Sequence, residues 1–295
     1  MTRCGFVSLV GAPNAGKSTL LNTILGQKVT IVSPKVQTTR RRIFGIHLQN
    51  DSQIVFVDTP GMFNPSTRLE KAMVGAAESS IFDCDIVCVL ADVTKSLTAP
   101  QKILDKLHNA DFPVVLLLNK VDKVEKEKLL AIAAELSQNY TFIAKIFMIS
   151  ALKNNGVDLL VEYLVNTIPE GGWMFPDDQI TDLSDQALAA EITREKLFWC
   201  LQQEIPYGLH VEHETWDDSK KSGLKLHQRI VIDRENHKGI VLGKNGAMLK
   251  RIGEMARKEI SKVLGRKVHL FLYVVVKEDW KEKREYYSSQ GLEFK

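Results

Sequence analysis

The sequence has little cysteine, no long apolar run and no repeated or low-complexity tract. Its cysteines (Cys4, Cys84, Cys88 and Cys200) form no CxxC pair and no cluster with zinc-ligand spacing, which predicts reduced thiols in a reducing compartment. No apolar run approaches the roughly 20 residues that a membrane-spanning helix needs. Because a strand-length apolar run begins at Cys4, we expect no targeting segment and a cytoplasmic protein, at most peripheral on the inner face of the cell membrane.

Acidic residues are scarce toward the C-terminus. Residues 219–295 contain 19 Lys and Arg against 9 Asp and Glu, whereas residues 1–218 contain 20 against 27. The net charge of +3 therefore hides a strongly basic end, which favours an acidic partner such as a nucleic acid or a lipid surface. With 295 residues, the chain is long enough for two domains with separate cores.

A phosphate-binding motif follows the first apolar run. Residues 11–18 read GAPNAGKS, the pattern G-x-x-x-x-G-K-[ST], between a predicted strand at 4–10 and a predicted helix at 18–25. The glycines let successive N–H groups point at one anion, and the helix N-terminus adds partial positive charge there. Lys17 would reach the β- and γ-phosphates, and the Ser18 hydroxyl would ligate Mg²⁺. The predicted nucleotide-binding residues of this loop are Gly11, Ala12, Pro13, Asn14, Ala15, Gly16, Lys17, Ser18 and Thr19.

Strands and helices alternate along residues 1–168. The predicted strands lie at 4–10, 43–48, 53–57, 85–91, 113–118 and 146–149, with helical patterns between most of them. Near-continuous apolar strands are typical of a mostly parallel sheet covered by helices on both faces, so the predicted fold class is α/β. Ligands bind such sheets at the carboxyl ends of strands, where the motifs fall.

Three further motifs lie at such strand ends. In Asp58-Thr-Pro-Gly61, the carboxylate would hold Mg²⁺ and the Gly61 amide would approach the γ-phosphate. In Asn119-Lys-Val-Asp122, the Asp122 carboxylate would accept hydrogens from guanine N1 and N2 and reject adenine. The Ser150-Ala151 backbone would donate to guanine O6. The predicted nucleotide-binding residues here are Asp58, Thr59, Pro60, Gly61, Asn119, Lys120, Asp122, Ser150 and Ala151.

The four motifs, in this order, resemble those of the translation-factor-like GTPases. The resemblance implies hydrolysis of GTP to GDP, with Lys17, Thr39 and Gly61 as catalytic residues and Ser18, Thr39 and Asp58 as magnesium ligands. Thr38 and Thr39 are both candidates for the hydroxyl that closes on Mg²⁺, and the similarity to bacterial GTPases carrying T-T-R favours Thr39. Met62 stands where Ras-like proteins place a water-orienting Gln, so slow turnover is expected. Asn14 resembles an asparagine that ligates K⁺ in several of these GTPases, and potassium use is left open.

Residues 169–185 are rich in Pro, Gly and Asp and are predicted to be a linker. A helix and β-runs follow, which predicts a smaller α+β domain at 186–280 and a basic tail at 281–295. The G-x-x-G at 243–246, before a basic helix, resembles a type II KH domain, whose loop clamps about four nucleotides. The RNA-binding residues implied are Ile240, Val241, Leu242, Gly243, Lys244, Asn245, Gly246, Lys250 and Arg251, with Arg257 and Lys258 as further phosphate contacts.

The tail leaves two interpretations open. Trp280, Tyr286 and Tyr287, with the basic residues between them, would extend the RNA surface or form a solvated final helix.

A GTPase joined to a C-terminal KH domain resembles the bacterial Era family over essentially the whole chain. The shared motifs are GAPNAGKS at 11–18, QTTR at 37–40, DTPG at 58–61, NKVD at 119–122, SALK at 150–153 and GKNG at 243–246. Membership implies a monomeric GTP/GDP switch with Mg²⁺ that binds small-subunit (16S-type) rRNA near its 3′ end and acts in 30S ribosomal subunit assembly. Asn245 departs from the glycine of many relatives. The alternative is a GTP-regulated module whose basic domain binds an anionic membrane or a protein partner; the β-runs and the G-x-x-G favour RNA.

Overall fold

The computed structural model describes residues 1–63, 65–219 and 223–294, and these form two compact units. Unit 1 contains residues 1–29, 39–182 and 290–294, and unit 2 contains residues 30–38 and 183–289. The predicted division at 1–168, 169–185, 186–280 and 281–295 is therefore revised: the segment 30–38 packs within unit 2, and the last residues pack within unit 1. Lys295 lies outside the described residues.

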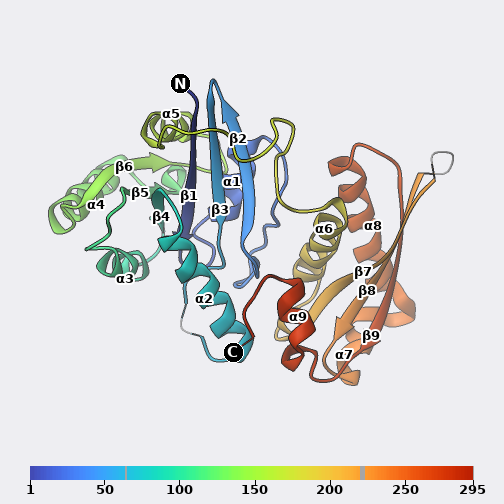
Figure 1. Ribbon diagram of the computed structural model, residues 1–295. Helices are drawn as coiled ribbons and strands as arrows, with labels where there is room; N and C mark the ends of the chain where they lie inside the picture. Colours follow the sequence, from blue (N-terminus) through green and yellow to red (C-terminus); the bar gives the residue numbers. More distant parts are fainter. Residues whose placement is uncertain (64, 220–222, 295) are drawn as a thin grey trace. The chain divides into compact units, whose positions relative to one another are not determined.

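Unit 1 is a sheet of six strands with helices on both faces (Figure 1). The strand order is β2-β3-β1-β4-β5-β6, and only β2 runs antiparallel to its neighbour. The strands are β1 (Arg3–Gly11), β2 (Ile43–Gln49), β3 (Ser52–Asp58), β4 (Ile86–Asp92), β5 (Val114–Asn119) and β6 (Ile143–Ile149). The predicted α/β fold class is confirmed.

Two apolar clusters explain which helices cover which face. Residues of α1 (Lys17–Leu25) and α5 (Val157–Thr167) share one cluster with β1 and β3. Residues of α2 (Arg68–Phe82), α3 (Thr98–Lys106) and α4 (Lys126–Asn139) share the other cluster with β4 and β5. Because the buried strands carry apolar side chains on both faces, both faces must be covered, which gives the three layers.

The register of the parallel strands brings the predicted motifs to one edge of the sheet. Leu9 pairs with Asp58, Gly11 with Leu90, and Asn119 lies between Asp92 and Ile149. The phosphate loop, the D-x-x-G turn and the N-K-x-D turn therefore start side by side at the carboxyl ends of their strands.

The predicted linker is largely part of unit 1. The Gln53 carboxamide oxygen accepts hydrogen bonds from the backbone of Met174 and Phe175, and its nitrogen donates to the Phe175 carbonyl at 2.8 Å. The Ile46 amide donates to the Ile180 carbonyl at 2.8 Å, beside the outer strand β2. The segment up to residue 182 is therefore held along this edge rather than spanning open space.

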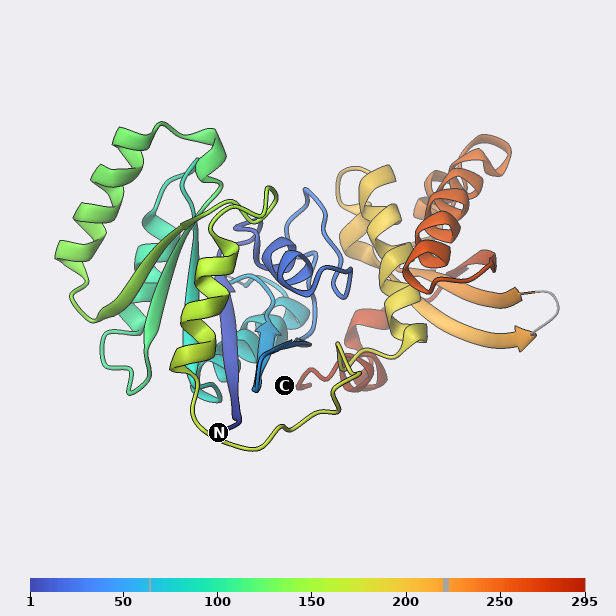
Figure 2. The same ribbon diagram turned by 90° about the horizontal axis from the view of Figure 1, so that it is seen from above.

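Unit 2 has a sheet of three strands in the order β7-β8-β9, with β9 parallel to β8. The elements are α6 (Asp185–Cys200), β7 (Leu209–Ser219), β8 (Gly223–Ile232), α7 (Glu235–Leu242), α8 (Ala247–Val263), β9 (Val268–Val276) and α9 (Arg284–Ser289). Figure 2 shows α6 and α8 lying next to each other on the sheet, and the two helices are in contact. Helix α7 was not predicted from the sequence, and because of it the G-x-x-G lies between two helices.

The tail is neither an RNA surface nor a solvated helix at its aromatic residues. Trp280, Tyr286 and Tyr287 are all buried within unit 2. The Trp280 indole donates to the Gly208 carbonyl at 3.2 Å, and the Tyr287 hydroxyl donates to the Lys281 carbonyl at 2.8 Å. These rings complete the core of unit 2, so both predicted roles for them are wrong.

Over the part of the chain that the structure describes, no helix combines the length and apolarity needed to cross a membrane.

Candidate functional site

The phosphate loop holds its lysine in place through backbone carbonyls. Lys17 is buried, and its Nζ donates to the carbonyls of Gly11 at 3.2 Å and Ala12 at 3.3 Å. Burial lowers the pKa of Lys17, and the nearby Asp58 opposes that shift. Gly16 has a φ of +106°, and a Cβ there would lie 2.3 Å from the Asn119 amide nitrogen, so only glycine fits. The loop thus places a buried cation where phosphate oxygens are expected.

Three oxygen atoms predicted to ligate magnesium lie together. The Ser18 hydroxyl donates to Asp58 Oδ2 at 2.7 Å and is 3.0 Å from the Thr39 hydroxyl, which donates to the same carboxylate oxygen at 3.5 Å. Asp58 is fully buried and Thr39 is nearly so. Hard oxygen donors of this kind are the ligands that Mg²⁺ prefers, so the residues fit the ion. The structure groups Thr39, and not Thr38, with Ser18 and Asp58.

The D-x-x-G turn lies against the phosphate loop. A Cβ on Gly61 would lie 2.9 Å from the Pro13 nitrogen, and the Met62 amide donates to the Gly11 carbonyl at 3.1 Å. Thr59 is fully buried and its hydroxyl donates to the Leu9 carbonyl at 2.9 Å, so its side chain holds the turn rather than facing a nucleotide. The Met62 side chain packs against the apolar cluster of α2, α3 and α4, and a thioether offers nothing to orient a water molecule.

A polar network prepares the base site. The Asn119 amide donates to the Ala15 carbonyl at 2.8 Å, and its oxygen accepts the amides of Lys120 at 2.8 Å and Ala151 at 3.0 Å. Asn119 therefore ties the phosphate loop to the two base-binding turns. The Ser150 hydroxyl donates to Asp122 at 2.6 Å and lowers the pKa of that carboxyl, which keeps it ionised to accept hydrogens from guanine.

Sequence reasoning missed Asp92 at the end of β4. Its carboxylate accepts Lys120 Nζ at 2.6 Å, and the same ammonium donates to the Asn14 carbonyl at 2.9 Å. Burial works against the charge of Asp92, but the Lys120 and Thr94 hydrogen bonds hold its pKa below the ordinary value. Asp92 thus fixes the lysine stem over the expected base. The sequence signal for this residue was an acidic side chain at the last position of a buried apolar strand.

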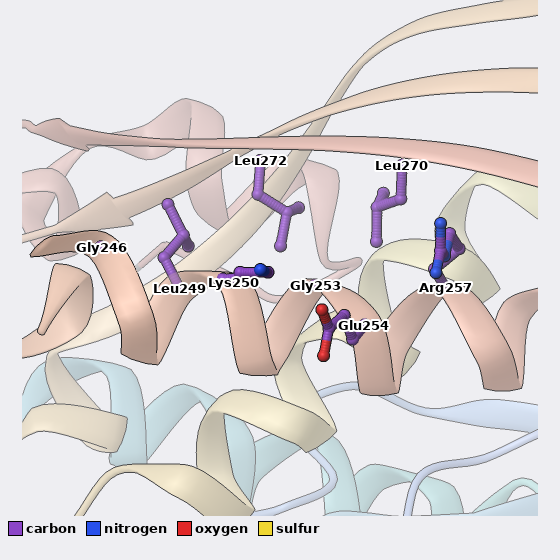
Figure 3. Close-up of a pocket in the computed structure, with 8 residues that line it drawn as sticks. All are labelled: Gly246, Leu249, Lys250, Gly253, Glu254, Arg257, Leu270 and Leu272. Carbon is purple, nitrogen blue, oxygen red and sulfur yellow. The ribbon is translucent and has the colours of Figure 1, made fainter.

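A second candidate site is a groove in unit 2 with a volume of about 400 Å³. Figure 3 shows it running along α8 beneath β9, with Leu270 and Leu272 of the strand and Leu249 of the helix pointing into it. The lining residues are Gly246, Leu249, Lys250, Gly253, Glu254, Arg257, Leu270 and Leu272. The apolar side chains could pack against unpaired bases, and the cationic side chains beside them could bind the phosphates that join those bases.

The G-x-x-G turn forms one end of this groove. Gly243 has a φ of +70°, and a Cβ there would lie 2.6 Å from the Met248 Cβ, so the close turn requires glycine. Asn245 adopts a φ of +52°, which asparagine tolerates better than most residues. Lys244 and Asn245 lie at the tip of the turn, where neither is buried.

The predicted RNA-binding residues are only partly brought together. Gly246 and Lys250 line the groove, as does Arg257. Val241 is fully buried in the core cluster of unit 2, so it is not available to bind RNA and this implied contact is wrong. Arg251 and Lys258 are exposed but are not among the lining residues. Four lining residues were not predicted: Leu249, Gly253, Leu270 and Leu272. The first two are four residues apart on α8 and the last two are two apart on β9, so each pair shares one face of its element and could have been found from that spacing.

The comparisons with known proteins match a GTPase family over part of unit 1 and a KH domain family over part of unit 2. Residues 6–120 match the family described as 50S ribosome-binding GTPase, and residues 204–281 match the KH domain family. The GTPase Era of Bradyrhizobium diazoefficiens is 49% identical over 294 residues, covering 99% of this chain and 95% of that protein. The GTPase Era of Rhizobium meliloti is 48% identical, covering 99% and 94%.

Two solved structures are similar over almost the full length. Era in complex with MgGDPNP and nucleotides 1506–1542 of 16S ribosomal RNA has a TM-score of 0.93 at 38% identity, with 99% of each chain covered. A tyrosine-to-alanine variant of Aquifex aeolicus Era, bound to GDP·AlF₄⁻, has a TM-score of 0.91 at 37% identity, with 98% of this chain and 99% of that chain covered.

Proposed function

Because the chain belongs to the Era family of GTPases, we propose that it is a GTP-dependent switch that binds the 3′-end region of small-subunit rRNA and acts in 30S ribosomal subunit assembly. The observation that carries the RNA half is the groove of unit 2, where leucines form the floor and Lys250 and Arg257 supply positive charge beside a G-x-x-G turn. The solved relative contains nucleotides 1506–1542 of 16S ribosomal RNA, which supports the same class of RNA for this chain.

The GTPase half follows from the residues around the phosphate loop. Lys17 and the loop amides would bind and orient the phosphates, and the Gly61 amide would meet the γ-phosphate. Ser18, Thr39 and Asp58 would hold Mg²⁺, which neutralises charge on the phosphate oxygens when bound. Asp122, kept ionised by Ser150, would select guanine, with Asn119 bracing that turn. Turnover would be slow, because Met62 cannot orient the attacking water.

A charge-reversal variant tests the assignment of RNA to unit 2. Lys244→Asp with Asn245→Asp puts negative charge at the tip of the turn while leaving both glycines, and aspartate tolerates the positive φ at position 245. We expect the free energy of RNA binding to weaken by more than about 2 kcal/mol and the salt dependence of binding to become shallower. GTP affinity should stay within about twofold, because the nucleotide site lies in the other unit.

The measurement is a filter-binding titration with a single-stranded 16S rRNA 3′-end fragment, beside a GTP titration. Unchanged RNA affinity in a folded variant would sink the RNA assignment. Loss of both activities would instead contradict the assignment of the two activities to separate units.

Three finer features belong to the same proposal. Asn14 would ligate K⁺, and equal hydrolysis rates in potassium and sodium would exclude this. The protein would be a cytoplasmic monomer, with peripheral membrane association as the rival role of the basic unit. Competition between the rRNA fragment and anionic phosphatidylserine vesicles separates the two: displacement of RNA by vesicles would favour the membrane.

A further inference from the structure

The segment 30–38, which precedes the switch threonine, is held by helix α6 of unit 2. Its residues cluster with unit 2, whereas Thr39 clusters with unit 1, so the chain passes from one unit to the other at the Thr38–Thr39 peptide bond. The segment contains no helix or strand, so it has no regular hydrogen bonding of its own. Its position therefore depends on the contacts that its backbone and its side chains make.

Two successive turns of α6 contact that backbone at two points. The Glu195 carboxylate accepts the Val32 amide at 2.8 Å, and the Trp199 indole donates to the Val32 carbonyl at 3.2 Å. The Arg194 guanidinium donates to the Thr38 carbonyl at 2.6 Å. Side chains of α6 therefore bind the backbone near both ends of the segment and restrict its course.

The two charged side chains of this clamp are unusually buried. Arg194 and Glu195 are each only 2% exposed, whereas arginine and glutamate are seldom fully buried unless they are paired. Glu191 pairs with Arg194 on one side, and against the effect of burial it keeps the pKa of the guanidinium above its ordinary value. Lys196 pairs with Glu195 at 2.6 Å. Hydrogen bonds to charged groups that are shielded from water are strong ones.

We propose that Arg194 is a positioning residue for GTP hydrolysis: by fixing the Thr38 carbonyl, it fixes the chain one peptide bond before Thr39. The inference rests on the proposed function, since it takes Thr39 as the hydroxyl that joins Ser18 and Asp58 around Mg²⁺. Glu195 and Trp199 hold the other end of the same segment. The RNA-binding unit thus supplies side chains that decide how readily the GTPase unit assembles its switch hydroxyl.

The test uses the full chain and the variants Arg194→Met and Trp199→Phe. Arg194→Met keeps most of the stem and removes the donor to Thr38. Trp199→Phe removes only the indole donor at a position that is 55% exposed, so it keeps the proposal testable if the buried change unfolds the protein. Arg266→Met and Trp216→Phe are matched controls in the same unit, because Arg266 donates to Asp218 and lies over the Trp216 ring rather than holding the segment 30–38.

We expect Arg194→Met to lower the single-turnover rate of GTP hydrolysis by about 10- to 100-fold, the range for losing one hydrogen bond to a charged group, with a smaller loss in Trp199→Phe. Hydrogen–deuterium exchange of residues 30–39, measured with a non-hydrolysable GTP analogue, should rise in both variants and in neither control. GDP affinity should stay within about twofold of wild type, because the phosphate and base contacts proposed for the nucleotide do not include Thr39.

Two results would overturn the inference. One is a folded Arg194→Met protein that hydrolyses GTP at the wild-type rate. The other is unchanged exchange of residues 30–39 in both variants. Failure of the proposed function looks different, because the wild-type chain itself would then not hydrolyse GTP or bind the RNA fragment.

Discussion

Gly253 allows the groove of unit 2 to be filled without disturbing the fold. It lies within α8 and lines the groove, and the nearest atom to a Cβ built there is Leu272 Cδ1 at 3.6 Å, an ordinary contact. Glycine in a helix interior costs about 1 kcal/mol relative to alanine, and leucine is nearly as good a helix former. Gly253→Ala and Gly253→Leu should therefore both raise the midpoint of urea unfolding slightly.

The two substitutions should differ in their effect on RNA. The alanine methyl lies against Leu272, whereas a leucine side chain projects into the space beneath β9 and excludes a base. Loss of one base contact is worth about 1–3 kcal/mol, so Gly253→Leu should weaken RNA binding by roughly 5- to 150-fold, and Gly253→Ala should bind nearly as wild type does.

Salt titration shows whether the loss comes from the bases or from the phosphates. Gly253→Leu removes no cation, so the slope of log affinity against log salt should match that of wild type. The assay is fluorescence anisotropy with a labelled 3′-end fragment at several salt concentrations. A stable Gly253→Leu protein with wild-type affinity would refute the assignment of bases to this groove, and a changed slope would refute the mechanism given for the loss.

Three further predictions concern the nucleotide site and the stability of unit 2. Asp122→Asn should shift preference from guanine toward xanthine nucleotides, whose position 2 carries an oxygen; unchanged GTP affinity by calorimetry would contradict the base site. Gly16→Ala should cost GTP binding about 2 kcal/mol or more, because its Cβ would displace the Asn119 amide and its φ is +106°; near wild-type binding would show that the network is not needed. Hydrogen bonds from His210, the larger cause, and from Lys277 lower the pKa of Glu212 from 4.5 to about 2. Glu212 therefore stabilises the fold above about pH 4.5, and that contribution is lost as the pH falls toward 2. Glu212→Gln should therefore lower the free energy of unfolding at pH 7 and make it fall less steeply between pH 4.5 and pH 2, as measured by urea titrations at each pH. The same pH dependence in wild type and variant would refute the pairing.

The strands of unit 1 and the place of the nucleotide motifs at their ends could be predicted because their signals are local. A buried parallel strand is an apolar run, and a motif that follows it must lie at the carboxyl edge of the sheet. Asn119 and Asp122 could therefore be assigned before any contact was known. The turn at Gly243 could also be predicted, because its G-x-x-G pattern directly precedes a recognisable basic helix.

Features that depend on distant partners could not be predicted. Residues 169–182 looked like a linker because they are rich in Pro, Gly and Asp, yet the buried carboxamide of Gln53 holds them on unit 1. Helix α7 is only eight residues long, and its Val241 is fully buried in the core of unit 2. Helices this short are seldom stable without tertiary packing, so its apolar end looked like an RNA contact.

The segment 30–38 shows the same limit with a functional consequence. Its irregular structure fits a sequence without apolar periodicity that contains Pro34, but nothing in its own residues states which unit holds it. That information lies in Arg194 and Glu195, more than 150 residues later, on a helix where charged side chains would ordinarily face solvent. Because those charges are buried against the backbone before Thr39, a substitution in the RNA-binding unit can alter the nucleotide site without changing any residue that binds nucleotide. From the sequence motifs alone, a substitution at Arg194 would be expected to affect RNA binding and not GTP hydrolysis.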